Sequence, residues 1–338
     1  MQDPVLNIAT VSVIASACVL SLAAGFYLFQ RHVEGRALLT YEPRRRAPWG
    51  PLVLVIPLFF ITSNFLPILG DSKEVVDQEA SNEFFYGVLF FSILMIAFVP
   101  AVMAWLVVDR QADIRDLGLP LSRHQLSLDV CRGVVACLAA LLPTLLLNYV
   151  LTVLLTQVFQ IDQVHPLIDQ LQNEGTTAML YVGIVSAVVA APLFEEFTFR
   201  VLLQGWLERV EDERIDFRAT ERQPDPAQED LEGRDPPSEL NGQFDAKPTS
   251  EIRPLVRPRH GWMPVLPHGW TPILISSVLF GLAHIGHGAA PVPLIFLGIV
   301  LGYLYQRTHR IAPCIVAHMV FNAYAMTLLW LSLKGESQ

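Results

Sequence analysis

Long apolar stretches separated by short polar segments run along most of the chain. About 20 helical residues are needed to cross the ~30 Å hydrocarbon layer of a bilayer, and eight stretches approach or exceed that length. They are residues 5–29, 49–69, 84–108, 128–155, 177–201, 269–289, 290–306 and 311–333. The pattern predicts an all-α fold, a polytopic transmembrane helical bundle of about eight spans. The shortest stretch follows its neighbour after only a glycine-rich break, so these two alternatively form a re-entrant pair.

Arginines are distributed unevenly among the polar loops. Loops that stay in the cytoplasm carry an excess of Lys and Arg. The basic loops contain Arg31, Arg36, Arg44, Arg45 and Arg46, then Arg110, Arg115 and Arg123, and finally Arg307 and Arg310. The loop 156–176 has neither Lys nor Arg. This alternation predicts that both termini face away from the cytoplasm.

Composition agrees with a membrane protein, since 52% of the residues are apolar and only 16% are charged. Residues 208–268 differ, being rich in proline, acids and arginines, and are predicted to form a disordered cytoplasmic insertion. Most of the formal net charge of -9 belongs to this segment, so the acidity says little about a substrate. We divide the chain into N-terminal helices, about four spans within 1–176, and a core at 177–333 that the insertion interrupts.

Several polar residues lie inside the apolar stretches, where burial in lipid is costly and a functional role is the default expectation. They are Glu195, Glu196 and Arg200 in FEEFTFR, His284 in FGLAH, and His318 with Asn322 in HMVFN. Together they supply carboxylates, imidazoles and an amide on three separate segments. Such a set can handle a water molecule and a carbonyl group, and it predicts an intramembrane hydrolase.

Helical spacing separates the two adjacent glutamates. Residues four apart share a helix face, whereas adjacent residues diverge by about 100°. Glu196 and Arg200 are therefore expected to form a buried ion pair that holds geometry. Glu195 is left near the inner end of its predicted span without an obvious cation, and a desolvated carboxylate is a stronger base than an exposed one. The alternative is that Glu195 pairs with a cation from another helix.

The two histidines are each accompanied by a residue four positions away. Phe280 and His284 share one face, as do His318 and Asn322. A single histidine in such a place is more often a packed core residue than a catalyst. Two of them on separate spans, together with Glu195, favour a catalytic site.

In these residues the chain resembles the CPBP family of intramembrane proteases, which includes the type II CAAX prenyl proteases and the bacteriocin-processing and immunity proteins. The family pattern is EExxxR, FxxxH and HxxxN, and here it begins at Glu195, Phe280 and His318 in the same order. The resemblance covers roughly residues 177–326. Two departures are Val201, where many relatives have glycine, and the long 208–268 insertion.

The resemblance implies a mechanism and its residues. Glu195 with His284 would activate water for attack on a peptide carbonyl, and His318 with Asn322 would stabilise the oxyanion, while Glu196, Arg200 and Phe280 would give structural support. The alternative is a metalloprotease in which Glu195, His284 and His318 hold a divalent metal such as zinc. Asn322 favours the first mechanism, because it is an uncommon zinc ligand and a good hydrogen-bond donor.

The expected function is a hydrolase, an intramembrane endopeptidase that acts near the cytoplasmic leaflet. Its expected partners are the lipid bilayer and a membrane-embedded or lipid-modified, CAAX-type peptide substrate. Nucleic acid is not expected to be a partner. The alternative is a catalytically silent membrane scaffold or a bacteriocin self-immunity protein. A proton-coupled transporter is disfavoured because the chain shows no internal repeat. The resemblance implies a bacterial plasma membrane as the location, with the endoplasmic reticulum as the alternative.

Overall fold

The computed structural model describes residues 4–43, 46–69, 78–160, 177–221 and 269–336. Within these ranges the regular structure is entirely helical, which confirms the all-α prediction there. The elements are α1 (Pro4–Val33), η1 (Pro51–Leu54), α2 (Val55–Leu69), α3 (Gln78–Arg110), α4 (Arg123–Val153), η2 (Leu154–Val158), α6 (Thr177–Val185), η3 (Ser186–Ala190), α7 (Ala191–Glu196), η4 (Phe197–Gln204), α8 (Gly205–Glu221), α10 (Thr271–Leu282), α11 (Pro291–Thr308) and α12 (Ala312–Glu336).

A helix occurs at each of the eight predicted apolar stretches, but the helices differ in length. Among the described residues, five are long and apolar enough to cross a membrane: Ile8–Val33, Phe85–Arg110, Arg123–Val158, Ala178–Ile215 and Ala312–Lys334. The apolar helices Pro51–Phe65 and Thr271–Leu282 are shorter. By length and composition the chain is a multi-pass integral membrane protein. Among the described residues, these lengths support five membrane crossings and do not show the eight that were predicted.

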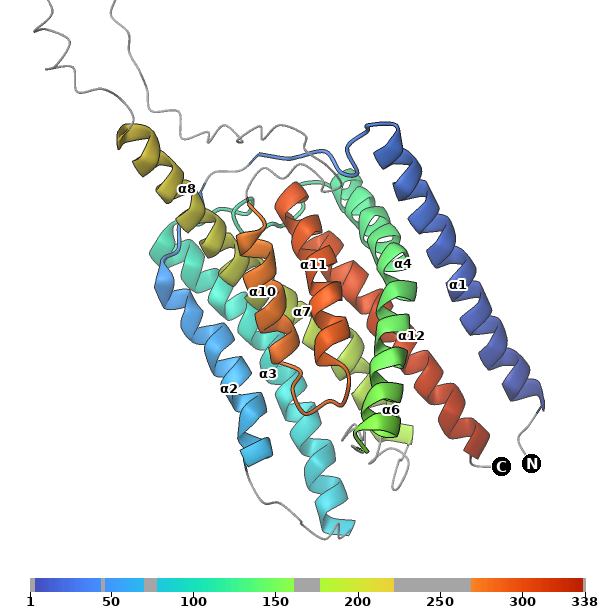
Figure 1. Ribbon diagram of the computed structural model, residues 1–338. Coiled ribbons are helices and arrows are strands. Elements are labelled where there is room, and N and C mark those ends of the chain that lie inside the picture. Colours follow the sequence, from blue (N-terminus) through green and yellow to red (C-terminus); the bar gives the residue numbers. More distant parts are fainter. Residues whose placement is uncertain (1–3, 44–45, 70–77, 161–176, 222–268, 337–338) are drawn as a thin grey trace, which may run out of the picture.

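The long helices lie roughly side by side, and several arginine-bearing connections meet at one end of the bundle (Figure 1). We call this the arginine-rich end. It comprises the segments 34–43, 46–50 and 111–122 and the turn between α11 and α12. The first residues of α1 and the last residues of α12 lie at the opposite end. This arrangement agrees with the alternation that the loop arginines predicted.

The helix that carries the FEEFTFR motif is longer than its predicted span. The elements α6, η3, α7, η4 and α8 follow one another without a break from Thr177 to Glu221, and we call them together the motif helix. The predicted insertion 208–268 is therefore helical in its first part, and residues 222–268 lie outside the described residues. Glu195 consequently lies well inside this long helix, and its place near the inner end of the membrane span stays a prediction.

The motif helix continues past the membrane motif because its polar residues divide between two faces. Glu208 and Asp212 are buried against the bundle. On the other side, Arg209 Nε lies 2.7 Å from Glu213 Oε1 in a largely exposed ion pair. Pairs of this kind at four-residue spacing support a helix that leaves the bundle. In Figure 1, α8 projects beyond the ends of its neighbours.

Helices α10 and α11 form a close hairpin. Two glycines allow the close approach, since a Cβ at Gly281 would lie 2.6 Å from the Pro291 carbonyl oxygen and one at Gly298 would lie 3.1 Å from Ser277 Cα. Helix α10 has 12 residues, which gives a length of about 18 Å, less than a bilayer core requires. The turn ends short of the far ends of α3 and α4 (Figure 1).

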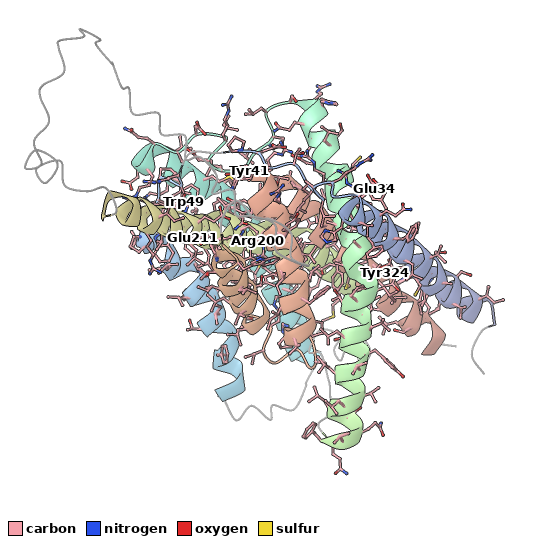
Figure 2. All side chains as sticks on the ribbon, turned by 45° about the horizontal axis from the view of Figure 1, so that its top comes forward. Glu34, Tyr41, Trp49, Arg200, Glu211 and Tyr324 are labelled. Atoms are coloured by element: carbon pink, nitrogen blue, oxygen red, sulfur yellow. The ribbon has the colours of Figure 1, made fainter. Side chains whose placement is uncertain are left out.

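Residues 34–43 and 46–50 lie at the arginine-rich end, and the second of these segments is attached to the motif helix. The fully buried Trp49 donates its indole Nε1–H to the Leu202 carbonyl oxygen at 3.1 Å. Arg209 Nη1 donates to the carbonyl oxygens of Ala47 and Trp49 at 3.3 and 3.0 Å. Figure 2 shows Trp49 at this end and Arg200 within the bundle.

Candidate active site

Glu195 and Glu196 lie on α7, a short α-helical stretch between the π-helical stretches η3 and η4. Such π-helical turns are rare and occur frequently at functional sites. Backbone carbonyls in both stretches accept hydrogen bonds from other helices. Ser276 Oγ donates to Phe199 at 2.8 Å, and Asn322 Nδ2 donates to Ala187 at 2.7 Å. These bonds attach α10 and α12 to the motif helix around the two glutamates.

Glu196 is fully buried, and both of its carboxylate oxygens have partners. Arg200 Nε donates to Oε2 at 3.0 Å, which confirms the predicted ion pair. His318 Nδ1 lies 2.9 Å from Oε1. Because the paired carboxylate accepts hydrogen bonds, the hydrogen belongs on His318 Nδ1. The ring then turns its Nε2 toward Glu195, whose Oε2 lies 3.9 Å away.

His284 follows the last turn of α10 and approaches the same carboxylate. Its Nδ1 lies 2.8 Å from the Phe280 carbonyl oxygen. A carbonyl can only accept, so this nitrogen carries a hydrogen. Its Nε2 lies 3.7 Å from Glu195 Oε2. The structure thus brings Glu195, His284 and His318 together from three separate helices.

Glu195 differs from Glu196 because none of the arginines that the structure describes lies within ion-pair distance of it. Among the described residues, its Oε2 accepts no hydrogen bond, and its charged-group contacts within 4 Å are the two imidazoles. With both Nδ1 atoms protonated, neutral His284 and His318 each turn a lone pair toward it. Three acceptors in a water-poor interior are unfavourable unless a proton donor or a cation lies among them. The arrangement suits a water molecule, an added proton or a metal ion.

The ring of Phe280 packs among these polar groups. Its centroid lies 5.1 Å from that of His284 and 5.6 Å from that of His318. The guanidinium carbon of Arg200 lies 5.2 Å from the same ring. Phe280 is fully buried, so it restricts the orientation of both imidazoles and excludes water from one side of the ion pair.

Asn322 lies on α12 one turn beyond His318, and both side chains contact the motif helix. Its bond to Ala187 uses one of the two hydrogens of the side-chain amide. The second hydrogen is available to a ligand. Asn322 therefore keeps one donor for the role that the family resemblance implies.

Three buried residues of the site region were not identified from the sequence. Ser276 accepts from Arg200 Nη1 at 3.0 Å and so fixes the guanidinium, but a serine in an apolar stretch gives no specific signal. Gln204 and Glu208 continue the line of Glu196 and Arg200 at four-residue spacing, and all are fully buried. The four-residue spacing could have predicted that Gln204 and Glu208 lie on the same helix face as Arg200. It was not used, because residues from 208 onward were expected to be disordered.

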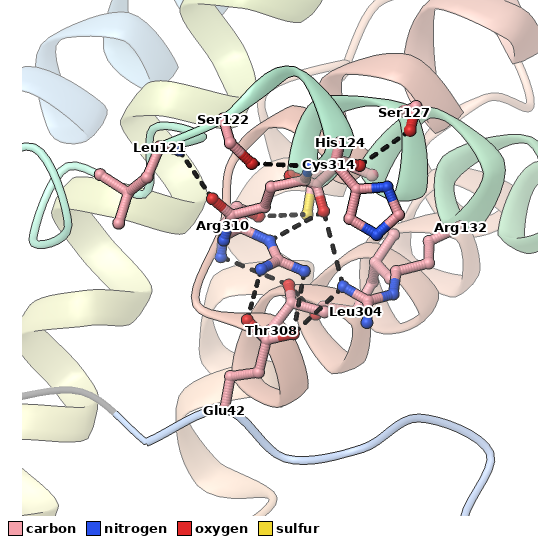
Figure 3. Close-up of polar contacts among 12 residues, drawn as sticks. Glu42, Leu121, Ser122, His124, Ser127, Arg132, Leu304, Thr308, Arg310 and Cys314 are labelled. Carbon is pink, nitrogen blue, oxygen red and sulfur yellow. Dashed lines mark hydrogen bonds and ion pairs between the residues drawn. The ribbon is translucent and has the colours of Figure 1, made fainter.

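A second group of charges lies at the arginine-rich end and consists of the buried Asp129 and Arg310 and the partly exposed Glu42 and Arg132, which we call the outer cluster. Arg310 Nε lies 2.8 Å from Asp129 Oδ1, and its Nη2 donates to Glu42 Oε1 at 2.9 Å. Arg132 Nη1 lies 3.2 Å from Glu42 and 3.5 Å from Asp129. Figure 3 shows both guanidinium groups directed at Glu42. The two carboxylates and the two guanidinium groups of this cluster carry equal and opposite formal charges.

Glu195, His284 and His318 have donor types that suit zinc, and each imidazole has the second hydrogen bond that orients a metal ligand. Ligands at ~2.0–2.1 Å from one tetrahedral zinc ion lie roughly 3.3 Å apart. The 3.7 and 3.9 Å separations are wider. Within the described residues, no three His, Cys, Asp or Glu side chains form a ready metal site as they stand. Each of the two carboxylate–imidazole separations would have to shorten to match that spacing.

Comparison with known families identifies the C-terminal part of the core. Residues 253–324 match the family model described as type II CAAX prenyl endopeptidase Rce1-like. The match includes His284, His318 and Asn322, and it begins after Glu195. No curated protein and no solved structure gives a significant match to the chain. Residues 253–324 are thus similar to the type II CAAX prenyl endopeptidases of the Rce1-like family, the family that the ordered motifs indicated.

Proposed function

We propose that the chain is an intramembrane endopeptidase that cleaves membrane-associated or lipid-modified, CAAX-type peptides near the cytoplasmic leaflet. The observation that carries the proposal is the buried Glu195 carboxylate, which has no arginine partner and faces Nε2 of His284 and of His318. The Rce1-like match of residues 253–324 implies a protease-type hydrolase and supports the same conclusion.

In the proposed reaction, a water molecule lies between Glu195 and His284 and donates a hydrogen to the carboxylate. As the water oxygen forms a bond to the peptide carbonyl carbon, Glu195 takes the proton. The carbon–nitrogen bond then breaks, and that proton passes to the leaving amine. A general base of this kind typically contributes about 10²–10⁴-fold to the rate.

The oxyanion that forms in this step needs hydrogen-bond donors. Asn322 offers the amide hydrogen that Ala187 does not use. His318 already donates through Nδ1 to Glu196, so it donates through Nε2 only as an imidazolium. The adjacent carboxylates of Glu195 and Glu196 favour that charged form by Coulomb attraction. We assign Glu196, Arg200 and Phe280 to structural support of this arrangement.

A metal-dependent version of the reaction uses the same three residues. Glu195, His284 and His318 would hold a divalent ion such as zinc, which when bound would supply a Lewis acid and a water of increased acidity. Metal content of the purified native protein and of Glu195→Gln, measured by mass spectrometry, tests this version without an activity assay. About one zinc per native chain, lost in Glu195→Gln, would support it.

We place the arginine-rich end in the cytoplasm, because the basic loops meet there. We place the protein in a bacterial plasma membrane, as the family resemblance implies. The hairpin of α10 and α11 then enters from the cytoplasmic side and returns, in place of two of the eight predicted crossings. This topology keeps both termini outside the cytoplasm. It retains residues 177–333 as the catalytic core and 1–176 as the N-terminal helices.

The test is a quantitative survey of new peptide termini in membranes of cells that express either the native protein or Glu195→Gln at matched levels. Termini found only with the native protein would establish a peptidase, support Glu195 as its base and identify the substrates. Equal sets of termini would contradict the proposal and favour a catalytically silent scaffold.

A further inference from the structure

Four fully buried polar residues follow one another along the motif helix at four-residue spacing: Glu196, Arg200, Gln204 and Glu208. The first two belong to the candidate active site. The other two lead from it toward the arginine-rich end. Gln204 Nε2 donates to Glu208 Oε1 at 3.0 Å and to the Gly302 carbonyl oxygen of α11 at 2.9 Å. The line is therefore bonded to the neighbouring helix as well as along its own.

At the outer end of this line, Glu208 contacts a histidine in the turn between α11 and α12. His309 Nε2 lies 3.3 Å from Glu208 Oε2, and the side chains are 3% and 1% exposed. His309 Nδ1 lies 2.7 Å from the Glu42 carbonyl oxygen. The carbonyl requires a hydrogen on Nδ1. One further proton, on Nε2 or on the carboxyl group, lets Glu208 and His309 bond to each other.

The backbone of His309 makes this contact hard to reproduce with most other residues. His309 ends α11 in the left-handed region, with φ of 49°, which few residues besides Gly, Asn, Asp and His adopt readily. The ring is also in edge contact with Tyr41, with centroids 5.6 Å apart. His309 thus joins the segment 34–43, the start of α12 and the motif helix at one point.

The two helices that carry the site are consequently joined at two buried histidine–glutamate contacts. The inner contact, between His318 and Glu196, lies in the site. The outer contact, between His309 and Glu208, joins the same two chain segments. His309 precedes His318 by nine residues, and Glu208 follows Glu196 by twelve. The bond from Asn322 to Ala187 joins the same two helices on the far side of the inner contact, so the outer contact restrains them on the side of the arginine-rich end. The three acceptors around Glu195 need that restraint, because they do not attract one another while both imidazoles are neutral.

We propose that Glu208 and His309 are positioning residues, which hold the motif helix and α12 in the axial register that brings His318 to Glu195 and Glu196. This inference rests on the proposed function for its consequence in catalysis. The register itself is a physical property of the fold and is measurable without a substrate.

Cys314 provides the measurement. It is fully buried on α12 between His309 and His318, and its Sγ lies 3.5 Å from the Leu301 carbonyl oxygen. With Cys18 and Cys131 changed to Ser and Cys137 changed to Ala, Cys314 is the remaining thiol. Its rate of alkylation by N-ethylmaleimide in native membranes reports how often α12 separates from its neighbours.

The variants are Glu208→Gln, which removes the charge, and His309→Asn, which keeps a residue that tolerates a positive φ. The matched control is Glu213→Gln, five residues along the same helix in an exposed ion pair. We expect both test variants to alkylate Cys314 about tenfold faster than the parent, equivalent to roughly 1.4 kcal/mol in the opening equilibrium. In the peptidase assay kcat should fall with KM unchanged, and the control should change neither.

Alkylation rates equal to the parent in both variants would overturn the proposal, whether or not kcat changed. If Glu208→Gln reacts as fast as detergent-denatured protein, Glu208→Asp, which keeps the charge but shortens the side chain, is measured in its place. A parent protein without peptidase activity would contradict the proposed function alone, because the alkylation result would still decide the register.

Discussion

In the outer cluster, Glu42 and Asp129 each lie within 4 Å of an arginine, whereas the basic side chains within 4 Å of Glu195 are, among the described residues, two histidines. An arginine stays charged throughout the physiological pH range, but a histidine gains and loses a proton within it. The outer cluster therefore keeps cations beside its carboxylates throughout that pH range. The site keeps a carboxylate whose compensation depends on a proton, a water molecule or a ligand.

The difference indicates which buried charges stabilise and which react. Compensated charges in a low-dielectric interior mainly hold elements together, and removal of one partner is costly. An uncompensated carboxylate is a cost in the resting fold and persists where the rest of the structure enforces it. The two regions should consequently respond in opposite ways to substitution.

The sharpest contrast comes from Glu195→Gln. The amide keeps the size of the side chain but cannot act as a base, so we expect kcat to fall about 10²–10⁴-fold. The amide can also donate a hydrogen to an imidazole lone pair, so the midpoint of thermal unfolding should stay equal or rise. Peptidase assays and thermal unfolding of the same preparation measure both. A large fall in the midpoint would show that Glu195 is a compensated, structural charge.

The reverse result is expected from Arg310→Met in the outer cluster. This change leaves Asp129 without its nearest cation, and Asp129 is fully buried. The expected loss is about 3–5 kcal/mol in the free energy of unfolding, measured by denaturant titration. Arg132→Met is the control, because the Arg132 side chain is 22% exposed and should lose much less. Equal losses would remove the distinction between the two arginines.

The sequence predicted those features of the site that depend on local spacing. The pair of Glu196 and Arg200 follows from four-residue spacing and is present at 3.0 Å. That no arginine in the described part of the chain pairs with Glu195 followed from the small number of cations in the spans. The helices, too, occur where apolar length predicted them, because burial of a helix in lipid needs little besides an apolar run.

Features that depend on contacts between distant segments were not predictable. The bond from His318 to Glu196 joins residues 122 positions apart, and the bonds of Asn322 and Ser276 use carbonyls in π-helical turns that apolar periodicity does not reveal. The helical state of residues 208–221 was missed because composition describes the average of a segment. Burial of Glu208 against His309 overrides that average.

Asn322→Leu tests the donor side of the site. Leucine retains the approximate size of the side chain but offers no hydrogen, and the loss of one oxyanion donor typically costs about 10²–10³-fold in kcat. The Ala187 carbonyl oxygen also loses its partner at 2.7 Å. Thr327→Ala on the same helix, whose hydroxyl bonds only to its own helix at 2.8 Å, is the control. Unchanged kcat in Asn322→Leu would restrict Asn322 to a structural role.

The smallest expected effect concerns how closely α4 approaches α12 between the two regions. Gly133 lies one turn from Asp129, and a Cβ there would stand 2.6 Å from the Pro313 carbonyl oxygen and 2.8 Å from Val316 Cβ. Backbone on the α12 side must shift to accept it, so Gly133→Ala should lose about 1–3 kcal/mol in the free energy of unfolding. Gly25→Ala, with nothing within 4 Å of the new methyl group, should be neutral or slightly stabilising, because alanine favours a helix.

If Gly133→Ala displaces α12, kcat should fall along with stability, since His318 lies on the same helix. A loss of stability without a loss of kcat would show that His318 is held by its bond to Glu196 and not by the packing of α12 on α4.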